Sequence, residues 1–129
     1  MIVLDTDHCV AFLRGRLDIT LKASPDVSLA IAATTVGELI HGAHKSAQPE
    51  RNLRQIAQLL TLFDVLPFDA AAARYFGQHK ALLERRGQRL SDLDLQVAAI
   101  ALANDASLAT HNQAHFRHIP DLRLEDWLA

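Results

Sequence analysis

The sequence has little cysteine and no long apolar run, and these two absences narrow the classes of protein it can belong to. Cys9 is the only cysteine among 129 residues, so no internal disulfide can form, and a reducing, cytoplasmic location is expected. Polar residues interrupt every apolar stretch well before the roughly 20 residues that a membrane-spanning helix needs. The first residues also lack the basic segment that opens a signal peptide. We therefore expect a cytoplasmic protein with no membrane association.

An excess of charge of either sign is missing too. The formal net charge is −2, which argues against a protein whose whole surface binds nucleic acid but leaves a local basic groove open. Half of the residues are hydrophobic, which is too many for a disordered chain. We find no internal repeat, low-complexity tract or linker, so the sequence predicts one folded domain over residues 1–129.

Apolar runs that suit strands alternate along the chain with segments of helical periodicity. The expected strands are 1–4, 27–33, 63–68 and 107–112. A turn is expected at residues 5–7, followed by a helix through about residue 14. The other expected helices are 34–47, 49–63, 70–87 and 90–105, with Asp69 as the N-cap of the fourth helix and Gly87 at its C-terminal end. Leu122, Leu124 and Trp127 are the expected packing residues of the closing segment. This alternation predicts an α/β protein, in which helices cover both faces of a mostly parallel sheet.

Acidic and amide side chains follow the strands at the points where ligands bind in such sheets. Asp5 comes directly after the first strand, Glu38 lies near the start of the helix after the second, and Asn112 follows the last strand. Asp92 and Asp94 stand at the start of a nearly all-apolar helix. Carboxylates gathered in one cleft repel each other unless they share protons or a cation. The pattern therefore predicts a site for a hard divalent ion such as Mg²⁺ or Mn²⁺.

Helix capping offers a competing explanation for most of these acids. The conceivable caps are Asp7 for the first helix, a Thr35–Glu38 capping box for the second, and Ser91 or Asp92 for the fifth. Capping explains Asp5 less well, because a capping residue is expected nearer the helix start. It also explains Asp94 poorly, because an unpaired charge inside an apolar helix is costly to bury.

Four segments together resemble the motifs of PIN-domain ribonucleases, and more narrowly those of the VapC toxins of bacterial toxin–antitoxin pairs. In order they are VLDTDHCVAFL, TTVGELIHGA, LSDLDLQVAAIALA and LATHNQAHFRHIPDLRLEDW, and they span essentially the whole chain. The resemblance assigns the first three family acids to Asp5, Glu38 and Asp94. The fourth family position, often an acid, is Asn112 here, and His115 stands where similar members often have an acid. Asp92 is then a neighbouring extra acid with an auxiliary role.

The resemblance implies a PIN-like three-layer α/β/α fold and Mg²⁺- or Mn²⁺-dependent hydrolysis of an RNA phosphodiester. Asp5 and Asp94 are expected to hold the metal, and Glu38 to position or deprotonate the attacking water. Thr6 is expected to orient a carboxylate or a water from outside the metal's direct ligands. The number of metal ions is left open.

The resemblance further implies a homodimer, a cognate VapB-type antitoxin that blocks the site, and a structured RNA substrate. Initiator tRNA cut in its anticodon loop is one candidate substrate. Three basic groups could contact phosphates, and the preferred group is Arg85, Arg86 and Arg89, just before the third acid motif. The other two groups are Arg14 with Arg16 and Arg51 with Arg54.

Three alternative functions remain open from the sequence. The opening hhhDxD pattern also resembles haloacid-dehalogenase-like phosphatases, with Asp5 as nucleophile, although Cys9 stands where that signature has Thr or Val and no suitable later lysine is found. A zinc protein is suggested by His41 with His44, three residues apart, and by a helical face shared by His111, His115 and His118; against it, these histidines lack cysteine partners. A non-catalytic interaction module would use the acids as caps alone.

Overall fold

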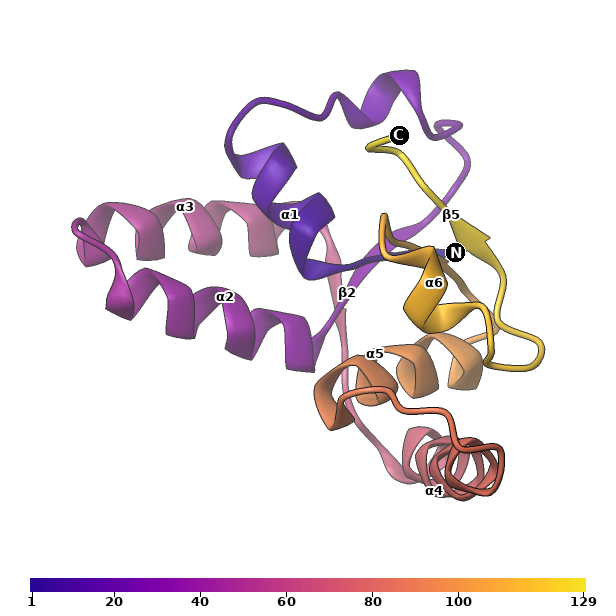
Figure 1. Cartoon of the computed structure of the whole chain (residues 1–129). Coiled ribbons are helices and arrows are strands. Elements are labelled where there is room, and N and C mark those ends of the chain that lie inside the picture. The colour runs from indigo at the N-terminus through magenta and orange to yellow at the C-terminus, as the bar shows by residue number, and fades with distance from the viewer.

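The computed structural model describes all 129 residues as a five-stranded sheet with helices on both sides (Figure 1). The strands are β1 (Ile2–Leu4), β2 (Leu29–Ala32), β3 (Asp64–Leu66), β4 (Ser107–Ala109) and β5 (Leu124–Glu125). The helices are α1 (Thr6–Leu13), the 3₁₀ turn η1 (Ile19–Leu21), α2 (Ala33–Lys45), α3 (Pro49–Leu62), α4 (Ala70–Arg85), α5 (Asp92–Ala103) and α6 (Gln113–Phe116). The strand order is β3-β2-β1-β4-β5, and every neighbouring pair is parallel.

Alternation along the short strands separates two hydrophobic cores. Val3 and Leu108 point to one face and pack with the apolar side of α5, whereas Leu4 and Ile31 point to the other face and pack with α1, α2 and α3. Figure 1 shows the same division, with α1–α3 grouped on one side and α4 and α5 on the other. The predicted three-layer α/β/α architecture is confirmed, and the sheet is parallel throughout.

Helix α5 is apolar around almost its whole circumference because it lies between the sheet and α4. Its buried residues are Leu95, Val97, Ala98, Ala99, Ile100 and Ala101. A helix enclosed on all sides keeps polar residues only at its ends. Asp94 is therefore confined to the first turn of α5, where the chain emerges at the edge of the sheet.

The helix caps correct two of the expectations drawn from sequence. The cap of α1 is Asp5 and not Asp7, because β1 runs into α1 without an intervening turn. Helix α2 begins directly after β2 at Ala33 and has no side-chain cap, so the Thr35–Glu38 capping box does not form. Ser91 caps α5 through the Asp94 N–H, which leaves Asp92 without that role.

The end of the chain holds the elements that the sequence did not predict. Strand β5 has two residues, and its Glu125 pairs with Ala109 of β4. Helix α6 is a single turn that buries Phe116. By contrast, α4 begins at the predicted cap, Asp69, and ends before Gly87, whose positive φ of 65° suits a helix end. None of the helices has the length and apolar character needed to cross a membrane.

Candidate active site

A pocket of about 190 Å³ opens where β1, β2 and β4 reach their carboxyl ends. β1 is paired with both of the other strands, Leu4 lying opposite Ile31 on one side and Ala109 on the other, so the three strand ends meet. The residues that line the pocket are Asp5, Thr6, Asp7, Thr35, Glu38, Asp94, Val97, Asn112 and Phe116. The three family acids predicted from sequence thus lie in one pocket, together with Thr6 and Asn112.

Asp5 is held at the pocket by both its backbone and its side chain. Its N–H donates to the carbonyl of Ala109 over 3.1 Å, which fixes the residue against β4. Its Oδ1 accepts from the backbone N–H of His8 over 2.9 Å and also contacts His8 Nδ1 at 2.8 Å. Oδ2 carries no hydrogen bond within the protein, and the side chain is only 14% exposed. One oxygen therefore anchors the carboxylate, and the other remains available to a ligand.

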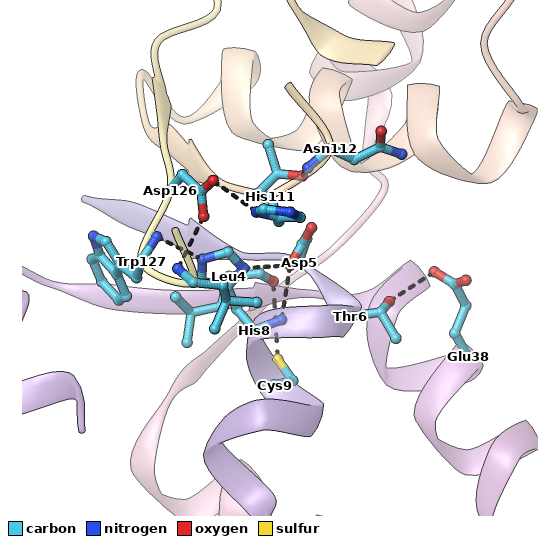
Figure 2. Close-up of polar contacts among 12 residues, drawn as sticks. Leu4, Asp5, Thr6, His8, Cys9, Glu38, His111, Asn112, Asp126 and Trp127 are labelled. Carbon is cyan, nitrogen blue, oxygen red and sulfur yellow. Dashed lines mark hydrogen bonds and ion pairs between the residues drawn. The ribbon is translucent and has the colours of Figure 1, made fainter. Parts of the chain in front are cut away.

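Glu38 faces Asp5 from the second turn of α2. Its Oε1 accepts from the Thr6 hydroxyl over 3.2 Å (Figure 2). Burial raises the pKa of Glu38, and the negative charges of Asp94, Asp5 and Asp7 raise it further, against a lowering by the Thr6 hydrogen bond. Burial is the largest cause, and the neighbouring carboxylates add to it because their negative charges repel that of Glu38.

Asp94 reaches the pocket from the first turn of α5. Ser91 Oγ accepts from its N–H over 3.1 Å, and the helix N-terminus favours a negative side chain. A second bond, from Thr34 Oγ1 to Gln96 Oε1 over 3.0 Å, ties α2 to α5. This link fixes the helix that carries Glu38 relative to the helix that carries Asp94.

Asp92 lies outside the pocket, so the structure does not place it among the acids that it was expected to assist. Its Oδ1 accepts from Lys80 Nζ of α4 over 2.9 Å, and both side chains are exposed. Two positions before Asp94, the turn of α5 directs this side chain toward α4, where it meets a lysine.

Asn112 lines the pocket from the segment that follows β4. Its N–H donates to Thr110 Oγ1 over 3.1 Å, and its Nδ2 lies 2.7 Å from His115 Nδ1. Because the amide nitrogen is the donor in the second contact, the side-chain oxygen is left to accept from another group. The residue brings a hydrogen-bonding group to the pocket and no charge.

The donor set suits a hard divalent ion surrounded largely by water. The polar lining consists of carboxylate, amide and hydroxyl oxygens, which Mg²⁺ and Mn²⁺ prefer. No three Asp, Glu, His or Cys side chains converge on a single ion position. Thr35 Oγ1 is buried at the pocket wall and has no hydrogen-bond partner, so it is free to bond to a polar group in the pocket. These residues fit an ion held by one or two carboxylates and by water.

The histidines do not form the zinc site that the sequence left open. His111 pairs with Asp126, His115 with Asn112 and His118 with Gln88, so the three diverge. His41 and His44 are exposed on α2, with no third ligand beside them.

Two features were not anticipated from sequence, namely the buried His8, which contacts Asp5 from outside the pocket, and the unpartnered Thr35 in the pocket wall. The spacing of Asp5 and His8 is the three-residue interval between an N-cap and the residue whose N–H it accepts. That spacing could have predicted the hydrogen bond from the His8 N–H to the Asp5 carboxylate. The ring contact depends on burial, which the spacing alone does not predict.

Basic side chains border a second groove, of about 410 Å³, between α1, α2 and α3. This groove shares Thr6 and Glu38 with the acidic pocket, and Arg14 and Arg51 line it. The preferred arginines from sequence, which are Arg85, Arg86 and Arg89, are exposed at and beyond the end of α4 and make no ion pair.

Comparison with known proteins gives consistent matches over the whole chain. The model of the PIN domain family matches residues 2–122. A "tRNA(fMet)-specific endonuclease VapC" of Shigella flexneri is 36% identical, over 97% of this chain and 96% of that protein. Among solved structures, VapBC2 from Rickettsia felis bound to a promoter DNA fragment superposes with a TM-score of 0.90 at 32% identity, covering 98% of this chain and 99% of that one. VapBC-1 from nontypeable Haemophilus influenzae superposes with a TM-score of 0.90 at 30% identity, covering all of both chains.

Proposed function

Because this chain belongs to the PIN-domain family of VapC ribonucleases, we propose that it is a metal-dependent endoribonuclease, the toxin of a type II toxin–antitoxin pair. The observation that carries the proposal is the shared pocket of Asp5, Glu38 and Asp94. These acids come from the junction of β1 with α1, from α2 and from α5, which are distant along the chain. Membership of this family also removes the phosphatase alternative, in which Asp5 would be a nucleophile.

The mechanism assigns a separate task to each side chain of the pocket. A bound Mg²⁺ or Mn²⁺ supplies positive charge that stabilises the phosphate transition state and favours deprotonation of water. Asp5, through its free Oδ2, and Asp94 are the residues that would hold the ion. Glu38 accepts a proton from the attacking water. The Thr6 hydroxyl donates to Glu38 and so keeps its carboxylate turned toward the pocket.

The proposed substrate is a structured RNA, and the first candidate is initiator tRNA. The relatives from Shigella flexneri and Salmonella typhimurium carry the name tRNA(fMet)-specific endonuclease, and this chain is 36% and 34% identical to them. The partner we propose is a VapB-type antitoxin, since the solved relatives are VapBC complexes. We also propose that the protein forms a homodimer. Asn112 is proposed to hydrogen-bond a water or the phosphate.

The decisive experiment compares Asp5→Asn with Asp92→Asn in an RNA cleavage assay. Asp5→Asn should reduce the cleavage rate by more than about 100-fold, which is the upper end of the loss caused by changing a residue outside the metal's direct ligands. Asp92→Asn alters a carboxylate on the same edge but outside the pocket, so it should cut RNA as the parent does. Cleavage should require added Mg²⁺ or Mn²⁺ and stop with a chelator.

Cleavage by folded Asp5→Asn at the parental rate, or activity that survives chelation, would contradict the metal-dependent assignment. A parent protein that binds RNA without cutting it would favour the non-catalytic module instead. Purified initiator tRNA, compared with elongator tRNA of similar fold, tests the substrate. Sequencing of the new RNA ends then locates the cut.

A further inference from the structure

A buried imidazole lies directly behind the proposed metal-binding carboxylate. The side chain of His8 is fully buried, and its Nδ1 lies 2.8 Å from Oδ1 of Asp5. Its Nε2 lies 3.1 Å from the backbone nitrogen of Trp127 (Figure 2). The ring therefore joins the start of α1 to the segment that follows β5, and both of its nitrogens are occupied.

The two contacts together fix the tautomer of the ring. A backbone N–H can only donate, so Nε2 of His8 must accept from Trp127 and carries no proton. Nδ1 then carries the ring proton and donates it to Asp5. The short contact is accordingly a hydrogen bond from a neutral ring to a carboxylate, although its distance also meets the criterion for an ion pair.

We infer that His8 is a positioning residue that holds Oδ1 of Asp5 and thereby directs Oδ2 into the pocket. The inference builds on the proposed function, because it assigns His8 a part in presenting a metal-binding group. Two donors from one residue, the backbone N–H and Nδ1–H, bind the same oxygen and restrict rotation of the carboxylate. Such support behind a ligand typically changes metal affinity or activity by about 10–100-fold.

The C-terminal segment keeps the ring in place. Trp127 is buried, its indole contacts the His8 ring edge-on with centroids 6.1 Å apart, and its Nε1 donates to Glu125 over 3.3 Å. Asp126 accepts from the Leu128 N–H over 2.9 Å and contacts His111 at 2.8 Å. With Glu125 paired to β4, this segment has little freedom, and the Trp127 N–H is presented to His8 in one orientation.

The experiment compares three variants for Mn²⁺ affinity, by calorimetry, and for cleavage at saturating metal. His8→Leu removes the ring donor and should weaken Mn²⁺ binding by about 10–100-fold, with a fall in kcat and little change in KM. His8→Asn places an amide N–H near the position of Nδ1 and should recover most of the loss. The control is His79→Leu, which removes a half-buried histidine that contacts a backbone carbonyl on α4, far from Asp5 along the chain, and it should match the parent.

Nitrogen NMR of the metal-free parent tests the inference without relying on activity or on a stable variant. His8 should show a protonated Nδ1 and a bare Nε2. A ring protonated on Nε2, or on both nitrogens, would overturn the inference, as would a folded His8→Leu protein with parental metal affinity and kcat. If the parent cuts no RNA, the proposed function fails by itself, whereas the NMR result still decides the arrangement of His8.

Discussion

At the level of single residues, Asp5 serves both a helix and the pocket. Its Oδ1 caps α1, and its Oδ2 remains free toward the other acids. Capping and metal binding therefore need not be competing explanations for one carboxylate, because the two oxygens face different groups. Because Asp5 caps α1, Asp7, two residues further along the chain, is exposed and caps no helix.

The pKa of Glu38 leads to a prediction on stability in metal-free buffer. Because the folded-state pKa is raised, the folded protein binds the proton more tightly than the unfolded chain does. The stability that this group contributes is present at low pH and is lost as the pH rises above about 4.3, the ordinary value, through the folded-state pKa. Glu38→Gln should therefore raise the free energy of unfolding at pH 7 and flatten its pH dependence. Urea unfolding between pH 4 and 8 with a chelator measures both.

The control for this prediction is Glu84→Gln, since Glu84 is an exposed glutamate of α4 outside the pocket. It should not stabilise the protein at pH 7. A Glu38→Gln protein that is less stable than the parent at pH 7 would mean that Thr6 and its surroundings favour the charged form.

The pocket acids were predictable because their chemistry and their place after strands are both local features of the sequence. Asp5, Glu38 and Asp94 each follow a strand or open a helix, so one topology brings them together. His8 was not predictable as a support, because its second contact comes from Trp127 at the other end of the chain. Neither residue type nor spacing in the first motif indicates that contact.

At the level of elements, the site depends on helix starts. Helices α1, α2 and α5 each begin at the carboxyl edge of the sheet, and each contributes one residue or more to the pocket from its first two turns. Long elements such as α3 and α4 were predictable from periodicity. Strand β5 was not, because two residues cannot display alternation, and its pairing with β4 defines it.

Ser91 offers a prediction at this level, since the N–H that it caps belongs to Asp94. Ser91→Ala should lower the free energy of unfolding by about 1 kcal/mol. Cleavage should fall as well, because the uncapped first turn of α5 frays and Asp94 moves with it. Ser91→Asp should keep both properties near those of the parent. Urea unfolding and RNA cleavage are measured side by side.

Ser24→Ala is the matched control, because Ser24 Oγ accepts a longer, 3.4 Å bond in an exposed turn. It should change neither stability nor cleavage appreciably. Equal losses from the two alanine variants would show that the cap of α5 has no special role.

At the level of the whole molecule, the sheet gathers acids at one edge and the groove beside them carries basic side chains. Arg14 and Arg51 line the groove that shares Thr6 and Glu38 with the pocket. The net charge of −2 is therefore no obstacle to RNA binding, because the cations needed for phosphates lie beside the acids.

This arrangement predicts which arginines contact RNA. Arg14→Ala combined with Arg51→Ala should weaken RNA binding. It should also make the slope of log K against log salt concentration shallower by about one unit per lost phosphate contact. Arg85→Ala combined with Arg86→Ala should have the smaller effect, since neither arginine lines the pocket or the groove that shares Thr6 and Glu38 with it. Binding is measured with Asp5→Asn protein to prevent cleavage.

The reverse order, with the α4 pair dominant, would support the sequence-based choice of Arg85, Arg86 and Arg89. Equal effects would mean that RNA spans both surfaces.

The central position of β1 has a consequence for biosynthesis. Val3 pairs with Leu108, so β1, which leads into Asp5, leaves the ribosome long before the strand beside which it must settle. A nascent polypeptide that has not yet exposed Ser107 contains all three acids but lacks β4 and β5 of the sheet that aligns them. The pocket is therefore incomplete until β4 has been synthesised and has paired with β1.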